Sequence, residues 1–434
     1  MIAQRSPAAS GSRTASAGPA LDALRRPWSF TETVTPADDV PTWNGRTLYE
    51  LLDAVRPHVG SDRVRQCGNH VVASADEVTC HVDPAGRPFV RNVIRCGMIW
   101  MCPVCSARER MKRQERARLA GKAHTAKGHT ILFLTVTIPH RHDEPGGLDH
   151  LLNGVLLKAW RRMQQGKTWQ RKRDEYGGWS VMRAIEITHG QNSWHPHLHA
   201  AIAVEKDLTT AEVEHLEKWM RARWIDRVSK LHRAPNAHGL KLVRVPPEDV
   251  EDVLSYSTKL ESAGFWAEVV SGPGKSRSFI DLVSAVADGD RQAVGLLREY
   301  ETATRGKNML VFGPGFELEP DDSGDDDAAS VVDDAEVEEN VRQAILDGNT
   351  DQPEDFVCWF DRYEWDQIAK GRHVGGLMRA IAGGIHEVSL FMIESGLRIC
   401  PRTWAEYVER VETRERMSKQ VITWAMFDQL VNSA

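Results

Sequence analysis

The chain has 434 residues, of which 41% are hydrophobic and 27% charged, a composition that predicts two or three globular units and excludes a fibrous or wholly disordered protein. No apolar run approaches the roughly 18 residues that a membrane-spanning helix needs, and the small polar residues 1–20 lack the apolar core of a secretory signal. Five of the seven cysteines fall between Cys67 and Cys105, which favours metal ligands over disulfides. We therefore expect a cytoplasmic protein.

The net charge of −6 is unevenly distributed along the chain. Residues 317–339 contain 12 acidic side chains and no Lys or Arg, whereas residues 1–316 carry a net charge of +9. A basic body joined to an acidic segment is typical of nucleic-acid-binding proteins, although ordinary solvated surfaces give the same pattern. The acidic segment itself has the composition of a disordered linker.

The hydrophobic pattern predicts a compact unit of strands and helices in the middle of the chain. In chain order, the predicted elements are a disordered start (1–40), a helix (48–55), a cysteine-rich segment (61–106), a basic helix (106–122), a strand (131–138), a helix (149–165), a β-hairpin (179–188 and 196–204, with its turn at 189–194), a helix (209–230), a strand (239–245) and a helix (247–260). This order describes an α+β fold with an antiparallel sheet and helices on one side.

We divide the chain into five regions on these grounds. They are a mostly disordered N-terminal region (1–60), a cysteine-rich zinc-binding segment with the basic helix (61–125), the α+β domain with a C-terminal extension (126–316), an acidic linker (317–345) and a mainly helical C-terminal region of unknown role (346–434).

The predicted hairpin carries the pattern His197-Leu198-His199. Because side chains i and i+2 of a strand point to the same face, both imidazoles project together while Leu198 points into the core. Glu186 on the preceding strand falls beside them if it pairs opposite His197 or His199, whereas a one-residue slip sends it to the other face. Two histidines and a carboxylate leave positions for water and phosphate oxygens, which suits Mg²⁺ or Mn²⁺ acting as a Lewis acid. The alternative is a pair of ordinary strand histidines.

Tyr256 lies on the helix that follows the last strand of this unit. Asp252 at i−4 and Lys259 at i+3 share its helical face. A phenol with a pKa of about 10 is a poor nucleophile at neutral pH, so a lysine and a nearby metal ion would both favour the reactive phenolate. The alternative is a tyrosine that only packs at the rim of the core.

Cys96, Cys102 and Cys105 have the spacing of a zinc knuckle. The CPVC turn presents two thiolates to one Zn²⁺, and Cys96 supplies a third. We choose Cys67 as the fourth ligand; the alternatives are Cys80, His70 and His81. Four protein ligands close a zinc site, which predicts a structural role in bracing the loops that lead into the basic helix.

Three motifs in this order resemble those of rolling-circle plasmid replication initiators (Rep proteins) of Gram-positive and actinobacterial plasmids, which belong to the HUH endonuclease superfamily. The motifs are FLTVTIPH (133–140), EITHGQNSWHPHLHAAIAV (186–204) and SYSTKL (255–260). The stretch RCGMIWMCPVCSARERMKR (95–113) is similar to the cysteine-rich segment that precedes the nuclease in the actinobacterial branch. The resemblance covers residues 60–316, and residues 340–434 only loosely.

The resemblance implies an HUH-endonuclease fold in which His197 and His199 bind the catalytic metal and Tyr256 attacks a DNA phosphate. The products would be a 5′-phosphotyrosine and a free 3′-hydroxyl that primes a polymerase, and the enzyme would rejoin the strand at termination. Implied partners are plasmid origin DNA, both duplex and single-stranded, with a host helicase and polymerase as candidates. One relative of this type has a Glu one turn before the Tyr; here Asp252 holds that position beside Glu251, and both are candidates for the terminating base.

Three other functions stay open at this point. The first is a relaxase or transposase with the same metal and tyrosine chemistry, which the cysteine knuckle and the motif order disfavour. The second is a non-catalytic zinc-containing DNA-binding regulator, which the intact His-x-His pattern and Tyr256 disfavour. The third is a metallohydrolase acting on small molecules, which gives no role to Tyr256 or to the basic body.

Overall fold

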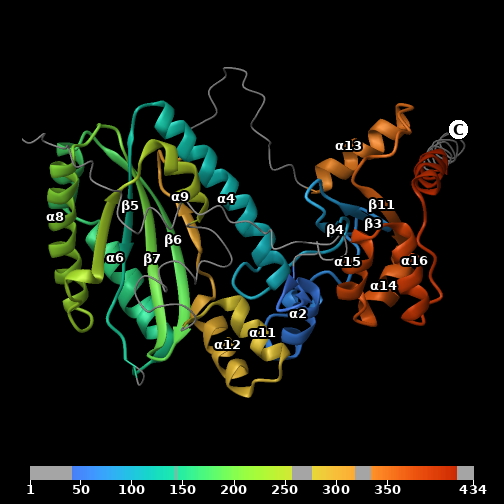
Figure 1. Cartoon of the computed structure of the whole chain (residues 1–434), viewed down its shortest axis with the longest axis horizontal. Helices are drawn as coiled ribbons and strands as arrows, with labels where there is room; N and C mark the ends of the chain where they lie inside the picture. The colour runs from blue at the N-terminus through green and yellow to red at the C-terminus, as the bar shows by residue number, and fades with distance from the viewer. Residues whose placement is uncertain (1–41, 142–143, 257–275, 318–333, 418–434) are drawn as a thin grey trace, which may run out of the picture.

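The computed structural model describes residues 42–141, 144–256, 276–317 and 334–417 (Figure 1). Lys259, the predicted disordered start and residues 318–333 of the predicted acidic linker lie outside these ranges. Within them, no helix combines the length and the apolar character needed to cross a bilayer.

The predicted hairpin and the apolar strand before it form the middle of a large antiparallel sheet. Its strands, in spatial order, are β10 (Leu310–Phe312), β6 (Trp179–Gly190), β7 (Ser193–Val204), β5 (Thr130–Val136) and β8 (Leu240–Arg244), with β9 (Ser276–Arg277) on the end of β6. The hairpin is longer and its turn tighter than predicted, because pairing continues to Gly190 and Ser193. The strands predicted at 131–138, 179–188, 196–204 and 239–245 are confirmed.

Helices cover both faces of this sheet. One face packs against η2 (His150–Leu156), α6 (Leu157–Met163) and α8 (Thr210–Ser229), and the other against α4 (Pro103–Ala126) and α9 (Val250–Tyr256). The prediction of helices on one side only is therefore wrong. The reason lies in β7, where Leu198 and Ile202 face α6 and α8 while Ala201 and Ala203 face α4 and α9. A strand that is apolar at both parities is buried on both faces.

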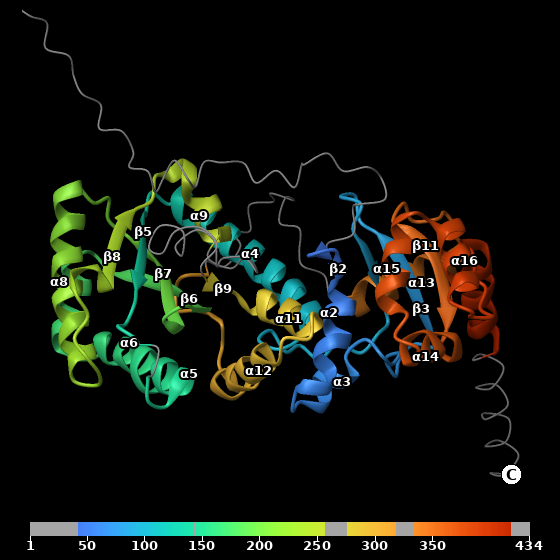
Figure 2. The same ribbon diagram turned by 60° about the horizontal axis from the view of Figure 1, so that its bottom comes forward.

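A smaller antiparallel sheet lies at the other end of the molecule (Figures 1 and 2). Its strands, in spatial order, are β11 (Phe356–Asp361), β3 (Glu77–Val82) and β4 (Pro88–Val90). Strand β11 belongs to the region predicted as a helical C-terminal unit, whereas β3 and β4 belong to the predicted zinc-binding segment. Two segments assigned to different regions therefore share one sheet.

The rest of the C-terminal region is helical, as predicted. Its helices are α13 (Asp334–Leu346), α14 (Arg362–Lys370), α15 (Val374–Ala382), α16 (Ile385–Glu394) and a helical stretch at 404–417. Helix α13 occupies the last part of the segment predicted as an acidic linker. Between this body and the large sheet lie α2 (Leu48–Val55) and the long helix α4, which reaches from α2 to the large sheet (Figure 2).

Candidate active site

The β6–β7 register brings Glu186 to the histidine face of the large sheet. Glu186 pairs directly opposite His197, and its Oε2 lies 2.8 Å from Nε2 of His199. Ligand atoms of all three residues lie within 4.8 Å of one another. His197 and His199 are only 3% and 4% exposed. The three predicted ligands therefore form one cluster of two buried histidines and a half-buried carboxylate, on the face that α4 and α9 cover.

The surroundings of the two histidines favour ligation of a cation. Thr135 Oγ1 lies 3.2 Å from Nδ1 of His199, and the Phe133 ring stacks on the same imidazole at 5.5 Å, so the orientation of His199 is fixed. Both ring nitrogens of His197 are buried and have no hydrogen-bond partner within the described residues. Burial lowers the pKa of His197 to about 3, which keeps its imidazole neutral. A neutral imidazole with an unpaired nitrogen beside a carboxylate fits a divalent metal ion.

Two further histidines extend this cluster. The His195 ring lies 3.8 Å from that of His197, and the His140 ring lies 4.3 Å from that of His195. Burial lowers the pKa of both. They line a cleft of about 540 Å³ between the hairpin turn and residues 235–239. The i−2 spacing of His195 from His197 could have identified it in the sequence, whereas His140 lies beyond the end of β5 and carries no such signal.

The basic helix α4 brings a positive charge to the same place. Burial lowers the pKa of Arg110, while the Tyr300 hydroxyl and the Glu186 carboxylate act in the opposite direction. Arg110 Nε also donates to Ser106 Oγ at 3.2 Å, which holds the side chain against its own helix. A guanidinium that interacts electrostatically with a carboxylate of this cluster is suited to receive a phosphodiester.

Helix α9, which carries the predicted nucleophile, lies on the histidine face of the sheet. Its apolar residues pack with α4 and with the sheet residues Ile131, Phe133 and Ala201; they are Val250, Val253 and Leu254. The Glu251 carboxylate accepts a 2.6 Å bond from Arg118 of α4, whereas Asp252 is exposed. The helix ends at Tyr256, whose side chain lies outside the described part of the structure, as does Lys259.

Close packing at Gly121 holds α9 against α4. A Cβ atom at Gly121 would overlap Leu254 Cδ1 and lie 2.9 Å from Val250 Cγ1. We expect Gly121→Ala to push the helices apart and lower the free energy of unfolding by about 1–3 kcal/mol, measured by chemical denaturation. The control is Gly295→Ala in α12 (Arg291–Thr304), where an added Cβ meets nothing within 4 Å and should stabilise the helix by about 0.5–1 kcal/mol. Equal effects of the two substitutions would contradict this packing.

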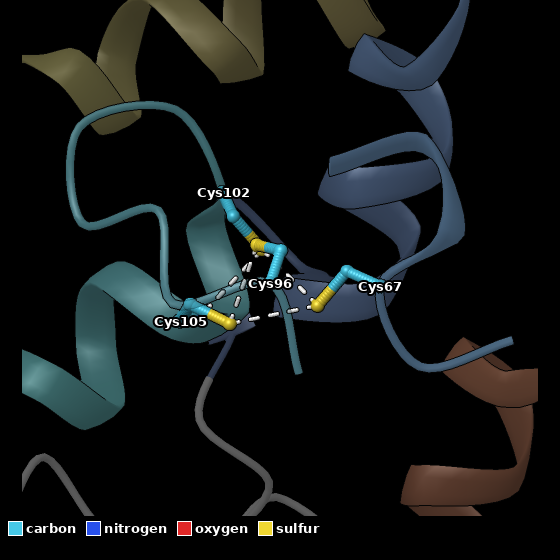
Figure 3. Close-up of side chains that lie close together, drawn as sticks. All are labelled: Cys67, Cys96, Cys102 and Cys105. Atoms are coloured by element: carbon cyan, nitrogen blue, oxygen red, sulfur yellow. Dashed lines mark hydrogen bonds between the residues drawn. The ribbon is translucent and has the colours of Figure 1, made fainter. Parts of the chain in front are cut away.

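Four cysteines converge where α4 begins (Figure 3). Cys105 Sγ lies 3.5 Å from Sγ of Cys67 and of Cys96, and Cys102 Sγ lies 3.6 Å from Sγ of Cys67. Four sulfurs bound tetrahedrally to Zn²⁺ at about 2.3 Å lie about 3.8 Å apart, so the spacing fits a zinc ion. Hydrogen bonds from the other three thiols lower the pKa of Cys105, which favours its thiolate. Cys80 lies elsewhere, opposite Cys358 in the small sheet.

Comparison with known proteins assigns the chain to a family. The model of a family described as "Replication protein" matches residues 89–361, which is more than half of the chain. The protein therefore belongs to this family of replication proteins, and the predicted resemblance to Rep proteins is confirmed. The matched region extends from β4 to the end of β11 and includes both the large sheet and α4.

Individual relatives are more distant. A "Protein rep" of Streptomyces lividans is 28% identical over 291 residues, covering 52% of this chain and 64% of the relative. A "Protein rep" of Bacillus amyloliquefaciens is 24% identical over 221 residues, covering 46% of this chain and 60% of the relative. The chain thus spans less than two thirds of the length of these relatives. No solved structure is significantly similar.

Proposed function

We propose that this protein is a plasmid rolling-circle replication initiator that nicks one strand of its origin DNA by a metal-assisted attack of Tyr256. The observation that carries the proposal is the position of α9 on the same sheet face as Glu186, His197 and His199. A nucleophile at the end of that helix and a metal at that cluster would approach a DNA strand from one side. Membership of the replication protein family supports the replication role.

In this proposal, Glu186, His197 and His199 would hold Mg²⁺ or Mn²⁺, which supplies Lewis-acid polarisation of the scissile phosphate when bound. Thr135 and Phe133 orient His199 for this task. The positive charge of Arg110 attracts the phosphodiester toward the same cluster.

Tyr256 Oη would attack the phosphorus in line, and the bond from phosphorus to the 3′-oxygen breaks. The 5′ end stays on the protein as a phosphotyrosine. The phenol proton passes to solvent, and the departing 3′-oxygen takes up a proton from solvent to give the 3′-hydroxyl that primes a host polymerase. Lys259 stabilises the phenolate before the attack. Asp252 is the candidate base for termination because it is exposed, whereas Glu251 is engaged with Arg118.

A covalent-adduct assay tests this function. The full chain is incubated with a single-stranded origin oligonucleotide and Mn²⁺, and a protein–DNA adduct that resists SDS is expected. EDTA should prevent its formation. Binding of the oligonucleotide without an adduct in either Mn²⁺ or Mg²⁺ would contradict the nicking activity and favour the non-catalytic regulator.

We further propose that Cys67, Cys96, Cys102 and Cys105 hold a structural zinc ion. The first two lie in loops, and Cys102 caps α4 by accepting a bond from the Cys105 backbone amide at 3.4 Å. A closed site of four thiolates would fix the N-terminal end of α4, and α4 in turn supports α9. Metal binding at such sites contributes directly to folding.

Cys102→Ser is expected to remove the zinc and lower the free energy of unfolding by about 4 kcal/mol or more, since loss of a structural metal belongs to the largest mutational effects. Zinc content is measured by mass spectrometry and stability by thermal melting. Cys400→Ser is the matched control, because Cys400 is an exposed free cysteine and its replacement should change neither quantity. Full zinc content in folded Cys102→Ser protein would contradict this assignment.

A further inference from the structure

A second, smaller cleft opens on the face of the large sheet opposite the histidine cluster. It has a volume of about 260 Å³ and lies between α6, α7 (Lys167–Glu175), β6 and the edge strand β10. Its lining includes three tryptophans and two arginines, namely Trp160, Trp169, Trp179, Arg173 and Arg183. None of the residues that line it is acidic. A small aromatic cleft with only positive charge is suited to a planar anionic ligand.

Arg183 gives the strongest indication that this cleft binds an anionic ligand. Its position on β6, next to Ala184 of the opposite face, directs it away from Glu186. Its Nη1 nitrogen is buried and has no hydrogen-bond partner within the described residues. Burial lowers its pKa and the nearby Arg161 lowers it further, yet a guanidinium stays protonated in proteins. The Arg183 side chain is half-buried, and a guanidinium with a buried nitrogen that lacks a partner favours an anion at this site.

The chain around the cleft is strongly basic. Residues 150–173, which form η2, α6 and most of α7, contain seven Lys or Arg and no Asp or Glu. The rings of Trp169 and Trp179 meet edge to face at 5.3 Å, so the tryptophans form a rigid wall. Proteins bind single-stranded nucleic acid by combining such basic surfaces with aromatic rings. Here the three tryptophans are 3–6% exposed, so only a small part of each ring is open to a base.

We propose that this cleft binds one nucleotide of single-stranded DNA, with its base against the tryptophans and its phosphate on Arg183 and Arg173. Neighbouring phosphates would follow the basic surface of α6 and α7. The strand would be the one exposed at the nicked origin, a role that rests on the proposed function; the cleft itself does not depend on it. This site is separate from the Tyr256 chemistry, because it lies across the sheet.

Binding of a fluorescein-labelled oligothymidylate to the full chain, followed by anisotropy, tests the site. We expect Arg183→Gln to weaken binding about tenfold, which corresponds to one lost contact of about 1.4 kcal/mol. Arg173→Gln, at the half-buried rim of the cleft, should also weaken binding and guards against misfolding of the first variant. Arg298→Gln removes the same charge from the exposed side of α12 and should leave the affinity within about twofold.

Photocrosslinking locates the bound base directly. An oligonucleotide containing 5-iodouracil should crosslink to Trp160, Trp169 or Trp179, and duplex DNA should not compete. The adduct assay on a short origin oligonucleotide, run on the same preparations, separates the two proposals. If both arginine variants form the adduct normally and bind oligothymidylate as the wild type does, the proposal that this cleft binds DNA is wrong. If those variants lose oligothymidylate binding and even the wild type forms no adduct, DNA binding in the cleft is supported and the nicking function is contradicted.

Discussion

Replacing both His197 and His199 by alanine is expected to reduce metal-dependent nicking by a factor of about 10³ or more, which equals about 4 kcal/mol of transition-state stabilisation. The reason is that the two imidazoles and Glu186 form the only metal-type cluster that the described residues place on the face shared with α9. Both side chains are buried, and His197 makes no protein hydrogen bond within the described part of the chain. Their replacement should therefore spare oligonucleotide binding.

Nicking of a labelled origin oligonucleotide in Mn²⁺ measures this effect, and calorimetric titration with Mn²⁺ measures the loss of metal binding. His215→Ala is the control, since His215 is exposed on α8, across the sheet from the cluster. In the control, nicking and Mn²⁺ binding should both stay at the wild-type level. Wild-type nicking by the folded double variant would show that these histidines are not the metal ligands.

Tyr256→Phe is expected to abolish the covalent adduct entirely, because the substitution keeps the aromatic ring and removes the only atom that would attack phosphorus. Oligonucleotide binding and the melting temperature should not change. The control is Tyr363→Phe, since Tyr363 is 81% exposed at the start of α14. An adduct of normal yield in the Tyr256→Phe protein would require a different nucleophile.

The alternation of side chains along a strand predicted that His197 and His199 share one face, whereas the position of Glu186 depended on the hairpin register. A period of two residues places His197 and His199 on one face, and pairing opposite His197 brings Glu186 to them. The cysteine spacing in the same way predicted the cluster around Cys102. In both cases a short local pattern fixed part of the cluster, whereas the positions of Glu186 and Cys67 stayed open until the structure was known.

Long-range contacts could not be predicted from local patterns. Pairing of β11 with β3 brings Cys358 beside Cys80, although most of the chain separates them in sequence. Neither strand carries a sequence motif that identifies its partner strand. Strand β7 is apolar at both parities, which indicates that both faces of the sheet are covered, but its sequence does not identify α4 and α9 as the helices that cover the second face. The electrostatic effect of Glu186 on the pKa of Arg110 likewise depends on how α4 packs on the sheet.

Identification of the amino acid that becomes joined to DNA is the most direct test of the whole account. The SDS-resistant adduct is digested with trypsin and nuclease, and the remaining nucleotide is located by tandem mass spectrometry. We expect a nucleotide mass on the phenolic oxygen of Tyr256, formed only when divalent metal is supplied. A nucleotide on any other side chain, or one acquired in the presence of EDTA, would contradict it.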